Sequence, residues 1–276
     1  MKTFVCFLMF AGLSQAGTIF NQGFESNTSG WTPSNGGSPV GTITRVASGT
    51  GGITAASGGF YAQITNSPND YMSGYGDYGF SYFGAGGDPT VYPGSAFSES
   101  ISVYIDPSSA GTNYWIDFTP GTSIPDGVGC GNSACGDEHN FRLAYDGSSV
   151  SVAVDGGGTM SVLNNPGWYT FQATFAKGSH PGDLVQTNMN ILSGTNLIGT
   201  AAVLGNSDGE TLTSANLSGT GFVWFAVAQN GAPTLNIDNL NASTLGSTPE
   251  PATWGLGGTA LLLLGIAKKK ALKAGI

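Results

Sequence analysis

Few side chains of this chain are of a kind and spacing that suits catalysis. There are two histidines, His139 and His180, and no H-E-x-x-H metalloprotease motif. His139 directly follows Asp137 and Glu138, a grouping that could hold a metal ion or exchange protons with a substrate. The same grouping is typical of a solvated turn before a strand, which is the interpretation we favour. We therefore assign no catalytic residue.

Two cysteines, Cys130 and Cys135, lie five positions apart in the glycine-rich stretch GCGNSACGD. In an oxidising compartment this spacing favours a disulfide that closes a small loop. A zinc site needs about four nitrogen or sulfur ligands, and only His139 is near. A pair of free thiols is the remaining alternative.

Aromatic residues gather in the stretch NDYMSGYGDYGFSYFG, which contains Tyr71, Tyr75, Tyr78 and Tyr82. Flat rings exposed on a surface can stack on the faces of sugars, so these four tyrosines are candidate ligand-stacking residues. The alternative, which we favour, is a long loop that covers one edge of the fold and buries its own rings.

The composition favours many short strands joined by turns. Glycine and proline occupy 58 of 276 positions and charged residues make up only 9%. Between Gly17 and Thr248 three cations face sixteen acids, a net charge of −13. A body this acidic repels phosphate backbones, so nucleic acid is excluded as a partner.

Period-two alternation places strands along most of the body. In the first clear example, Phe97, Ile101, Val103 and Ile105 share one face. The other predicted strands are 18–22, 40–46, 60–65, 113–118, 141–145, 150–154, 168–175, 184–192, 221–227 and 234–240. The Asp-Gly signal at 146–147 predicts that 141–145 and 150–154 form an antiparallel hairpin. About eleven strands without an amphipathic helix predict a two-sheet antiparallel sandwich in one domain, residues 17–245.

The two ends of this body carry the stretches IFNQGFESNTSGW (19–31) and LNIDNL (235–240). They resemble the opening strand and turn, and the closing strand, of the jelly-roll domains of many carbohydrate-binding modules. The resemblance implies a jelly-roll-like sandwich whose first and last strands are neighbours. It also implies a structural calcium ion shared by Glu25 and Asp238, and calcium does prefer several oxygen ligands.

The first sixteen residues predict an export signal. Lys2 precedes an apolar run from Phe4 to Leu13, and Ser14-Gln15-Ala16 is a small-x-small cleavage site. We expect this signal helix to be removed.

From residue 246 to 276 the composition changes abruptly. Pro249-Glu250-Pro251 is extended, because proline fixes its own φ and disfavours a helix before it. Residues 252–267 are uncharged and predict one apolar helix of about 24 Å, which is short for a bilayer core of about 30 Å. A basic cluster follows at 268–273, in which Lys268, Lys269 and Lys270 stop the helix on the cytoplasmic side.

This order of motif, apolar helix and basic stop resembles the PEP-CTERM sorting signal of Gram-negative bacteria. The resemblance implies an inner-membrane intermediate, cleavage by an exosortase, and delivery to the cell surface or extracellular matrix, often with exopolysaccharide. The alternatives are a plain membrane anchor and a buried helix.

Taken together, these features predict an exported surface or matrix protein whose body is a non-enzymatic binding or structural module, with polysaccharide as a candidate ligand. The alternative function is a secreted, glycosidase-like hydrolase that uses carboxylates of the sandwich, since such carboxylates can be distant in sequence.

Overall fold

The fold is taken from a computed structural model. It describes residues 17–33, 42–65, 78–82, 90–91, 96–109, 115–124, 135–154, 157–204, 222–230 and 234–245. Thr18–Thr244 is one compact unit. The expected signal helix and the whole sorting tail, with its proline motif and lysines, lie outside the described residues. Among the residues that are described, no helix is long and apolar enough to cross a membrane.

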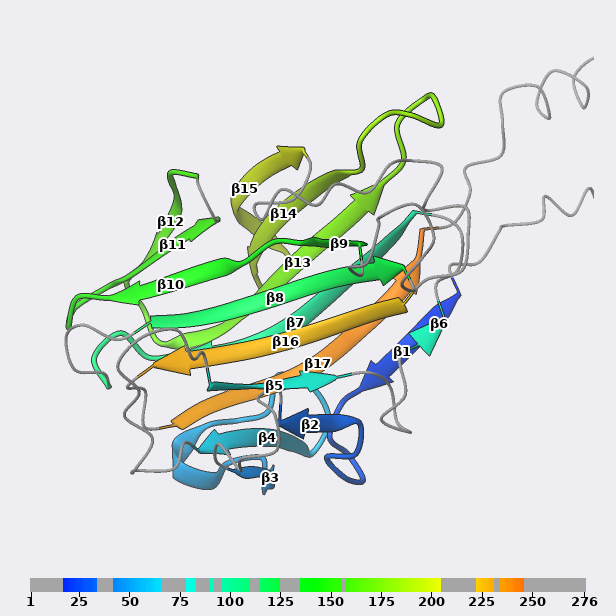
Figure 1. The fold of residues 1–276 in the computed structure, drawn as a ribbon. Coiled ribbons are helices and arrows are strands. Elements are labelled where there is room, and N and C mark those ends of the chain that lie inside the picture. Colours follow the sequence, from blue (N-terminus) through cyan, green and yellow to red (C-terminus); the bar gives the residue numbers. More distant parts are fainter. Residues whose placement is uncertain are drawn as a thin grey trace, which may run out of the picture. The chain divides into compact units, whose positions relative to one another are not determined.

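Nearly all regular structure in the described residues is strand, with one short 3-10 helix, η1 (Thr50–Gly52). The strands form two sheets, which we call sheet A and sheet B (Figure 1). Sheet A contains β1 (Thr18–Gln22), β3 (Thr42–Ala47), β4 (Phe60–Thr65), β7 (Phe97–Ile105), β13 (Gly167–Ala176), β14 (Gln186–Ser193), β15 (Asn196–Leu204) and β17 (Thr234–Thr244).

Sheet B contains β2 (Trp31–Pro33), β5 (Tyr78–Tyr82), β6 (Thr90–Val91), β8 (Trp115–Ile124), β9 (Cys135–Glu138), β10 (Phe141–Tyr145), β11 (Val150–Val154), β12 (Thr159–Leu163) and β16 (Phe222–Asn230). Its strand order is β12-β11-β10-β8-β16-β5-β2, with β6 beside β16 and β9 beside β8.

Sheet A runs β15-β14-β13-β7-β17-β4-β3, and β1 also pairs with β17. All the strand pairs in both sheets are antiparallel. The predicted fold class, a two-sheet antiparallel sandwich, is therefore confirmed.

The predicted hairpin at Asp146-Gly147 is also confirmed. Strands β10 and β11 pair from Phe141↔Val154 to Tyr145↔Val150. Gly147 has a φ of 90°, a conformation that glycine adopts without strain. The Asp146 carboxylate accepts hydrogen bonds from the backbone N–H of Ser148 and Ser149, which lowers its pKa.

Six strands were not predicted: β2, β5, β6, β9, β12 and β15. Several are too short or too rich in glycine for alternation to be visible, and β15 is largely exposed. The interpretation of the tyrosine-rich stretch as one long loop is wrong for residues 78–82, because β5 pairs with both β2 and β16.

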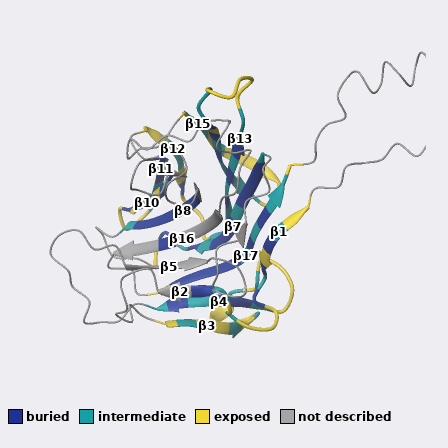
Figure 2. Cartoon of the chain, turned by 45° about the vertical axis from the view of Figure 1, so that its right-hand side comes forward, coloured by how far each residue is buried: buried dark blue, intermediate teal, exposed yellow. Residues whose placement is uncertain are grey.

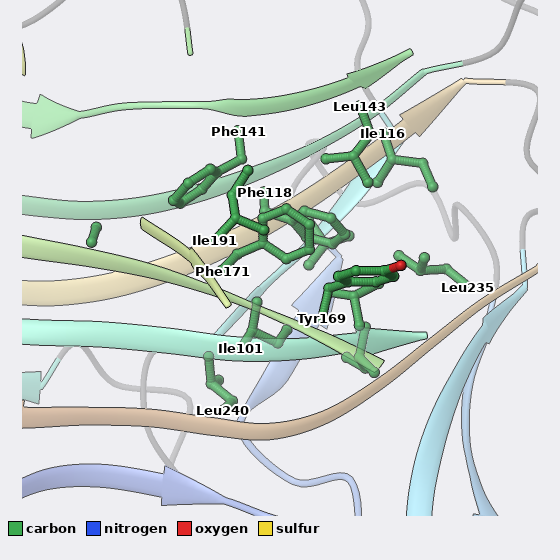
Figure 3. Packing of buried hydrophobic residues seen from close by; sticks show 14 of the residues in the cluster. Ile101, Ile116, Phe118, Phe141, Leu143, Tyr169, Phe171, Ile191, Leu235 and Leu240 are labelled. Carbon is green, nitrogen blue, oxygen red and sulfur yellow. The ribbon is translucent and has the colours of Figure 1, made fainter. Parts of the chain in front are cut away.

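Aromatic and branched side chains from both sheets fill the space between them (Figure 3). Phe171 of sheet A lies 5.0 Å from Phe118 and 5.3 Å from Phe141 of sheet B, measured between ring centroids. All three side chains are fully buried. Burying one such ring contributes about 2–3 kcal/mol relative to leaving it in water. Figure 2 shows how buried residues follow the sheet strands, while exposed ones gather at β3 and the connecting loops.

Candidate functional site

The first and last strands of the body are neighbours, as the sequence predicted. Strand β1 pairs with the second half of β17, with Asn21 opposite Asn241 and Gln22 opposite Leu240. Strand β4 pairs with the first half of β17, from Thr234 to Ile237. The partner on this side of β17 therefore changes between Ile237 and Leu240.

A β-bulge lies at this change of partner. The register of β17 against β7 shifts between Asp238 and Asn241, and Asn239 has a φ of 50°. Left-handed φ values are tolerated by asparagine better than by most residues. Before the bulge Ile237 points into the core, and after it Leu240 does so. The three-residue step between them places Asp238 on the outer side of sheet A.

The Asp238 carboxylate is fully buried under the loop that precedes β4. Its Oδ2 accepts a 3.0 Å hydrogen bond from Ser57 N, and its Oδ1 accepts one of 2.8 Å from Asn239 N. Ala56 N also donates to it. Burial raises the pKa of Asp238 to about 6, these N–H donors oppose the rise, and the charge of Glu25 adds to it.

Glu25 follows β1 and binds the same loop from its other side. Its carboxylate accepts hydrogen bonds from Gly59 N at 3.1 Å and from Phe60 N at 3.3 Å. Gly58 has a φ of +60°, and a Cβ there would lie 2.1 Å from Glu25 Oε1. Only glycine allows the backbone to approach this carboxylate so closely. We name Glu25, Asp238 and the backbone of residues 56–60 the acidic clamp.

Side chains around the acidic clamp hold its parts in position. Arg45 donates from Nε to Phe24 O at 2.8 Å and from Nη2 to Glu25 O. Trp168 donates from Nε1 to Thr54 O at 2.6 Å, so the loop is also tied to β13. Ser57 Oγ donates to Asn239 Oδ1 at 2.5 Å. These hydrogen bonds hold both the backbone at Phe24 and Glu25 and the loop before β4.

The donor set of the acidic clamp suits calcium. Two carboxylates lie close enough for one charge to raise the other's pKa, and the Asn239 side-chain carbonyl is adjacent. These are hard oxygen donors of the kind that calcium selects. A carboxylate offers about four lone-pair positions, so the backbone N–H groups leave some for a metal. Among the described residues, no cluster of three or more His, Cys, Asp and Glu side chains occurs, so further ligands would be neutral oxygens.

A second buried carboxylate, Glu99, was missed by the sequence analysis. It lies on the inward face of β7 with Ile101 and Val103 and is fully buried. Its Oε2 accepts a 3.3 Å hydrogen bond from Gly121 N of sheet B. Burial raises the pKa of this carboxyl well above its usual range, and the hydrogen bond from Gly121 opposes the rise. The period-two pattern of β7 was the signal, since it places position 99 on the apolar face.

The interpretation of His139 as part of a solvated turn is wrong. The residue is fully buried, and its backbone N–H donates to Pro120 O at 3.4 Å. Asp137 and Glu138 lie on β9, opposite Thr122 and Gly121 of β8, but their side chains are not described. The other histidine, His180, is exposed in a turn beside Asp183, with Nδ1 3.4 Å from Oδ2.

An ion pair on the outer side of sheet B was not foreseen either. Arg142 donates from Nε and Nη2 to the two oxygens of Asp117, at 2.9 and 2.6 Å. The Asp117 side chain is only 3% exposed. Alternation along both strands predicts outward positions for these residues, but only the β8–β10 register pairs them. Arg142 also lies over the Trp115 ring, 5.1 Å from its centroid.

The remaining predicted site residues stay predictions. Cys135 begins β9, but Cys130 lies outside the described residues, so the disulfide is not tested. Tyr71 and Tyr75 also lie outside them. Tyr78 and Tyr82 have a described backbone, with Tyr82 opposite Trp31 and Phe225, but no described side chain.

In sequence, the chain matches no protein-family model and no curated protein. Among solved structures, it is similar to a PL-14 alginate lyase from Aplysia kurodai, with a TM-score of 0.41, 11% identity, and coverage of 74% of this chain and 90% of that one. A legume lectin-like domain from Entamoeba histolytica gives a TM-score of 0.41 and 9% identity, covering 79% and 91%. The globular domain of T. cruzi calreticulin gives 0.40 and 12%, covering 93% and 98%. Similarities of this size do not separate a lyase from a lectin, so function has to be argued from the residues.

The raised pKa of Asp238 predicts a pH dependence of folding stability in calcium-free protein. A carboxyl whose pKa is higher in the folded state stabilises the fold while protonated, and this stabilisation is lost as pH rises from about 4 through about 6. Between pH 4 and pH 6 we expect the free energy of unfolding of Asp238→Asn to fall by about 1–2 kcal/mol less than that of the unsubstituted protein, after allowance for screening by water. Urea unfolding in a chelator at pH 4, 5, 6 and 7 measures it.

Glu25→Gln serves as the companion variant. This variant removes the negative charge that raises the pKa of folded Asp238. The fall in stability should therefore still begin near pH 4, which the unfolded state sets, and should end at a lower pH than in the unsubstituted protein. An unchanged pH profile in Asp238→Asn would show that another group, such as Glu99, causes the whole dependence.

Proposed function

We propose that this chain is an exported surface or matrix protein whose β-sandwich binds polysaccharide without cleaving it. The absence of cleavage is supported by the carboxylates whose side chains are described, because they have structural roles. Each has a structural contact or an interior position: Glu25, Glu99, Asp106, Asp117, Asp146, Asp183 and Asp238. A glycosidase needs two carboxyl groups facing one substrate. Glu25 and Asp238 lie close enough for the charge of one to raise the pKa of the other, but both accept hydrogen bonds from backbone N–H groups of the loop before β4.

Sugar binding is supported by the type of surface that the body presents rather than by a single residue. The acids are engaged in turns, in the acidic clamp and in the ion pair, and few cations occur in the body. Hydrogen-bonding side chains without strong charge suit the binding of neutral sugars, and aromatic rings can add stacking. The four tyrosines of the 71–82 stretch stay candidates for the stacking role.

Calcium has a structural role in this proposal. The ion would be held by Glu25 and Asp238, and its charge would offset the repulsion between them. It would tie the end of β1 and the loop before β4 to the last strand. These residues lie in the scaffold, so calcium supports the fold that presents the ligand-binding surface.

Delivery is assigned to the tail. The N-terminal export signal and the PEP-CTERM-like residues 248–270 together support transient insertion in the inner membrane. Pro249-Glu250-Pro251 is the sorting motif and an exosortase is the processing partner. The short apolar segment is suited to a temporary anchor, because its expected length is less than the thickness of a bilayer core.

We expect calcium to raise the melting temperature of the protein at pH 7 and a chelator to lower it. At a calcium concentration one hundred times the dissociation constant, the stabilisation is about 2.7 kcal/mol. Asp238→Ala should abolish the difference, while Asp146→Ala, in a turn distant in sequence, should keep it. Calorimetry with and without calcium makes the comparison. A calcium shift that persists in Asp238→Ala would place the ion elsewhere.

Polysaccharide binding without cleavage is tested by affinity electrophoresis of the full chain in mild detergent. Gels containing a neutral β-glucan, a glucomannan or a galactan should retard the protein, and no new reducing ends should appear on incubation. Retardation by none of them would reject the proposed ligand class. Release of reducing ends would instead establish the hydrolase alternative.

Processing at the tail is tested in a Gram-negative host that carries an exosortase. We expect the mature protein to have lost residues from near the motif onward, measured by intact mass of the released form. Replacing Pro249 and Pro251 with alanine should leave the tail attached and the protein in the membrane fraction. A host without the enzyme is the control, and equal release in both hosts would contradict the assignment.

A further inference from the structure

The outer side of sheet A carries an uncharged polar surface that runs across six strands. The register places one residue from each strand in a single row: Asn21 (β1), Asn241 (β17), Ser100 (β7), Gln172 (β13), Asn190 (β14) and Thr200 (β15). All six have amide or hydroxyl side chains. We name this set the amide row.

A second row of nearly the same chemistry lies beside the amide row, two residues along each strand except β1, where a register shift makes the step three residues. Its members are Thr18, Ser243, Ser98, Thr174, Asn188 and Ala202. Five of the six side chains carry a hydroxyl or an amide. The two rows together contain no ionisable side chain, although the body has a net charge of −13.

These side chains point away from the core. In β7, β13 and β14 they alternate with fully buried residues, for example Ile101 beside Ser100, Phe171 beside Gln172 and Ile191 beside Asn190. In β15 the alternate residues, such as Ala201 and Val203, are partly buried against the core. The ends of the amide row, Asn21 and Thr200, are exposed, and its central members are half-buried between their neighbours. The row is therefore a surface of the sandwich rather than part of its packing.

Few of the hydrogen-bonding groups in the two rows are used within the described part of the chain. Thr200 Oγ1 donates to Asn190 Oδ1 at 2.9 Å, and Gln186 Nε2 approaches Asn188 Oδ1 at 3.5 Å. Apart from the buried Ser98, the remaining amides and hydroxyls of the two rows reach the surface, where a ligand or water can bind them. Regularly spaced amides and hydroxyls can both donate and accept, which matches the hydroxyl groups of a sugar.

From this surface we infer that the amide row and its neighbour form the binding site for a neutral, hydroxyl-rich polysaccharide, whose chain lies across the strands. The inference rests on the proposed function: it says where on the sandwich the polysaccharide binds and that this polysaccharide is uncharged. Neighbouring strands repeat at about 4.8 Å, close to the repeat of an extended pyranose chain, so successive sugars would meet successive strands. An uncharged surface suits a neutral polymer, because no buried charge has to be left unpaired. A polyanion would gain no cation here.

The other partners that a sheet surface can have fit less well. Protein interfaces concentrate binding energy in aromatic residues and arginine, and neither row contains one. Nucleic acids need lysine or arginine to neutralise phosphates. The two rows offer a regular pattern of weak, neutral hydrogen bonds, which suits a polymer with many identical repeats.

The test compares the unsubstituted full chain with Gln172→Ala/Asn190→Ala, which removes two amides from the centre of the row. The probes are a neutral β-glucan, a glucomannan and a galactan, with alginate as a polyanionic control. Ser151→Ala is the matched control, because Ser151 is a half-buried strand residue on the outer side of sheet B. Affinity electrophoresis gives the dissociation constants, and circular dichroism melting verifies folding.

We expect at least one neutral polymer to bind, the double variant to bind it at least tenfold more weakly, and Ser151→Ala to bind as the unsubstituted chain does. Equal binding by the double variant would overturn the site and leave the proposed function standing. Failure to bind any of the neutral polymers or alginate would reject the proposed function itself. Retention on alginate alone would overturn the neutral ligand.

Two additional measurements distinguish loss of binding from misfolding and from self-association. If the double variant does not fold, the single variant Asn190→Asp keeps the shape of the side chain, and a loss of binding to the neutral polymer is again expected. Hydrogen exchange with and without the polymer should show slower exchange in β7, β13 and β14. Protection confined to sheet B would contradict the inference, as would protection that depends only on protein concentration, which would indicate a second copy of the chain.

Discussion

The last strand has to enter the interior of sheet A, and the bulge in it is the constraint on which this sheet depends. Strand β17 pairs with β7 along one side, while on the other side it pairs first with β4 and then with β1. Strands β4 and β1 follow one another along the same side of β17, and a regular strand could not pair in register with both of them and with β7. The extra residue between Asp238 and Asn241 resolves this conflict and returns Leu240 to the core. Without it, Leu240 would point outward and Asn241 inward.

The acidic clamp lies at this same change of partner, and its geometry follows from the bulge. Asp238 turns outward at the bulge, Glu25 follows β1, and residues 56–60 lead into β4. These segments lie where the partner of β17 changes from β4 to β1. The two carboxylates accept hydrogen bonds from backbone N–H groups of these segments. The cost is that two negative charges lie near each other, one of them fully buried.

The sequence predicted the sandwich because its longest strands alternate strongly and carry clear turn signals. The resemblance concerned the two end strands, so it could predict that β1 and β17 are neighbours; the calcium ion shared by Glu25 and Asp238 stays a prediction. It could not predict contacts that depend on register between distant strands. The Asp117–Arg142 pair, the Gly121–Glu99 hydrogen bond and the amide row all arise from pairings that alternation alone leaves undetermined. Short strands such as β2 and β6 contain too few residues to show a period.

Register also explains how an acidic body can have an uncharged surface. Along β7, β13 and β14 no outward position holds a charged side chain; most hold serine, threonine, asparagine or glutamine, and Tyr104, Trp168, Ala176 and Leu192 hold the others. The one acid of β7, Glu99, occupies an inward position. Asn241 reaches the amide row only because the bulge reverses the faces of β17 after Asp238. The acidic clamp fixes that bulge through Ser57 and Asn239. The contacts that order the clamp therefore also align the β17 and β1 positions of the row with those of β7, β13 and β14.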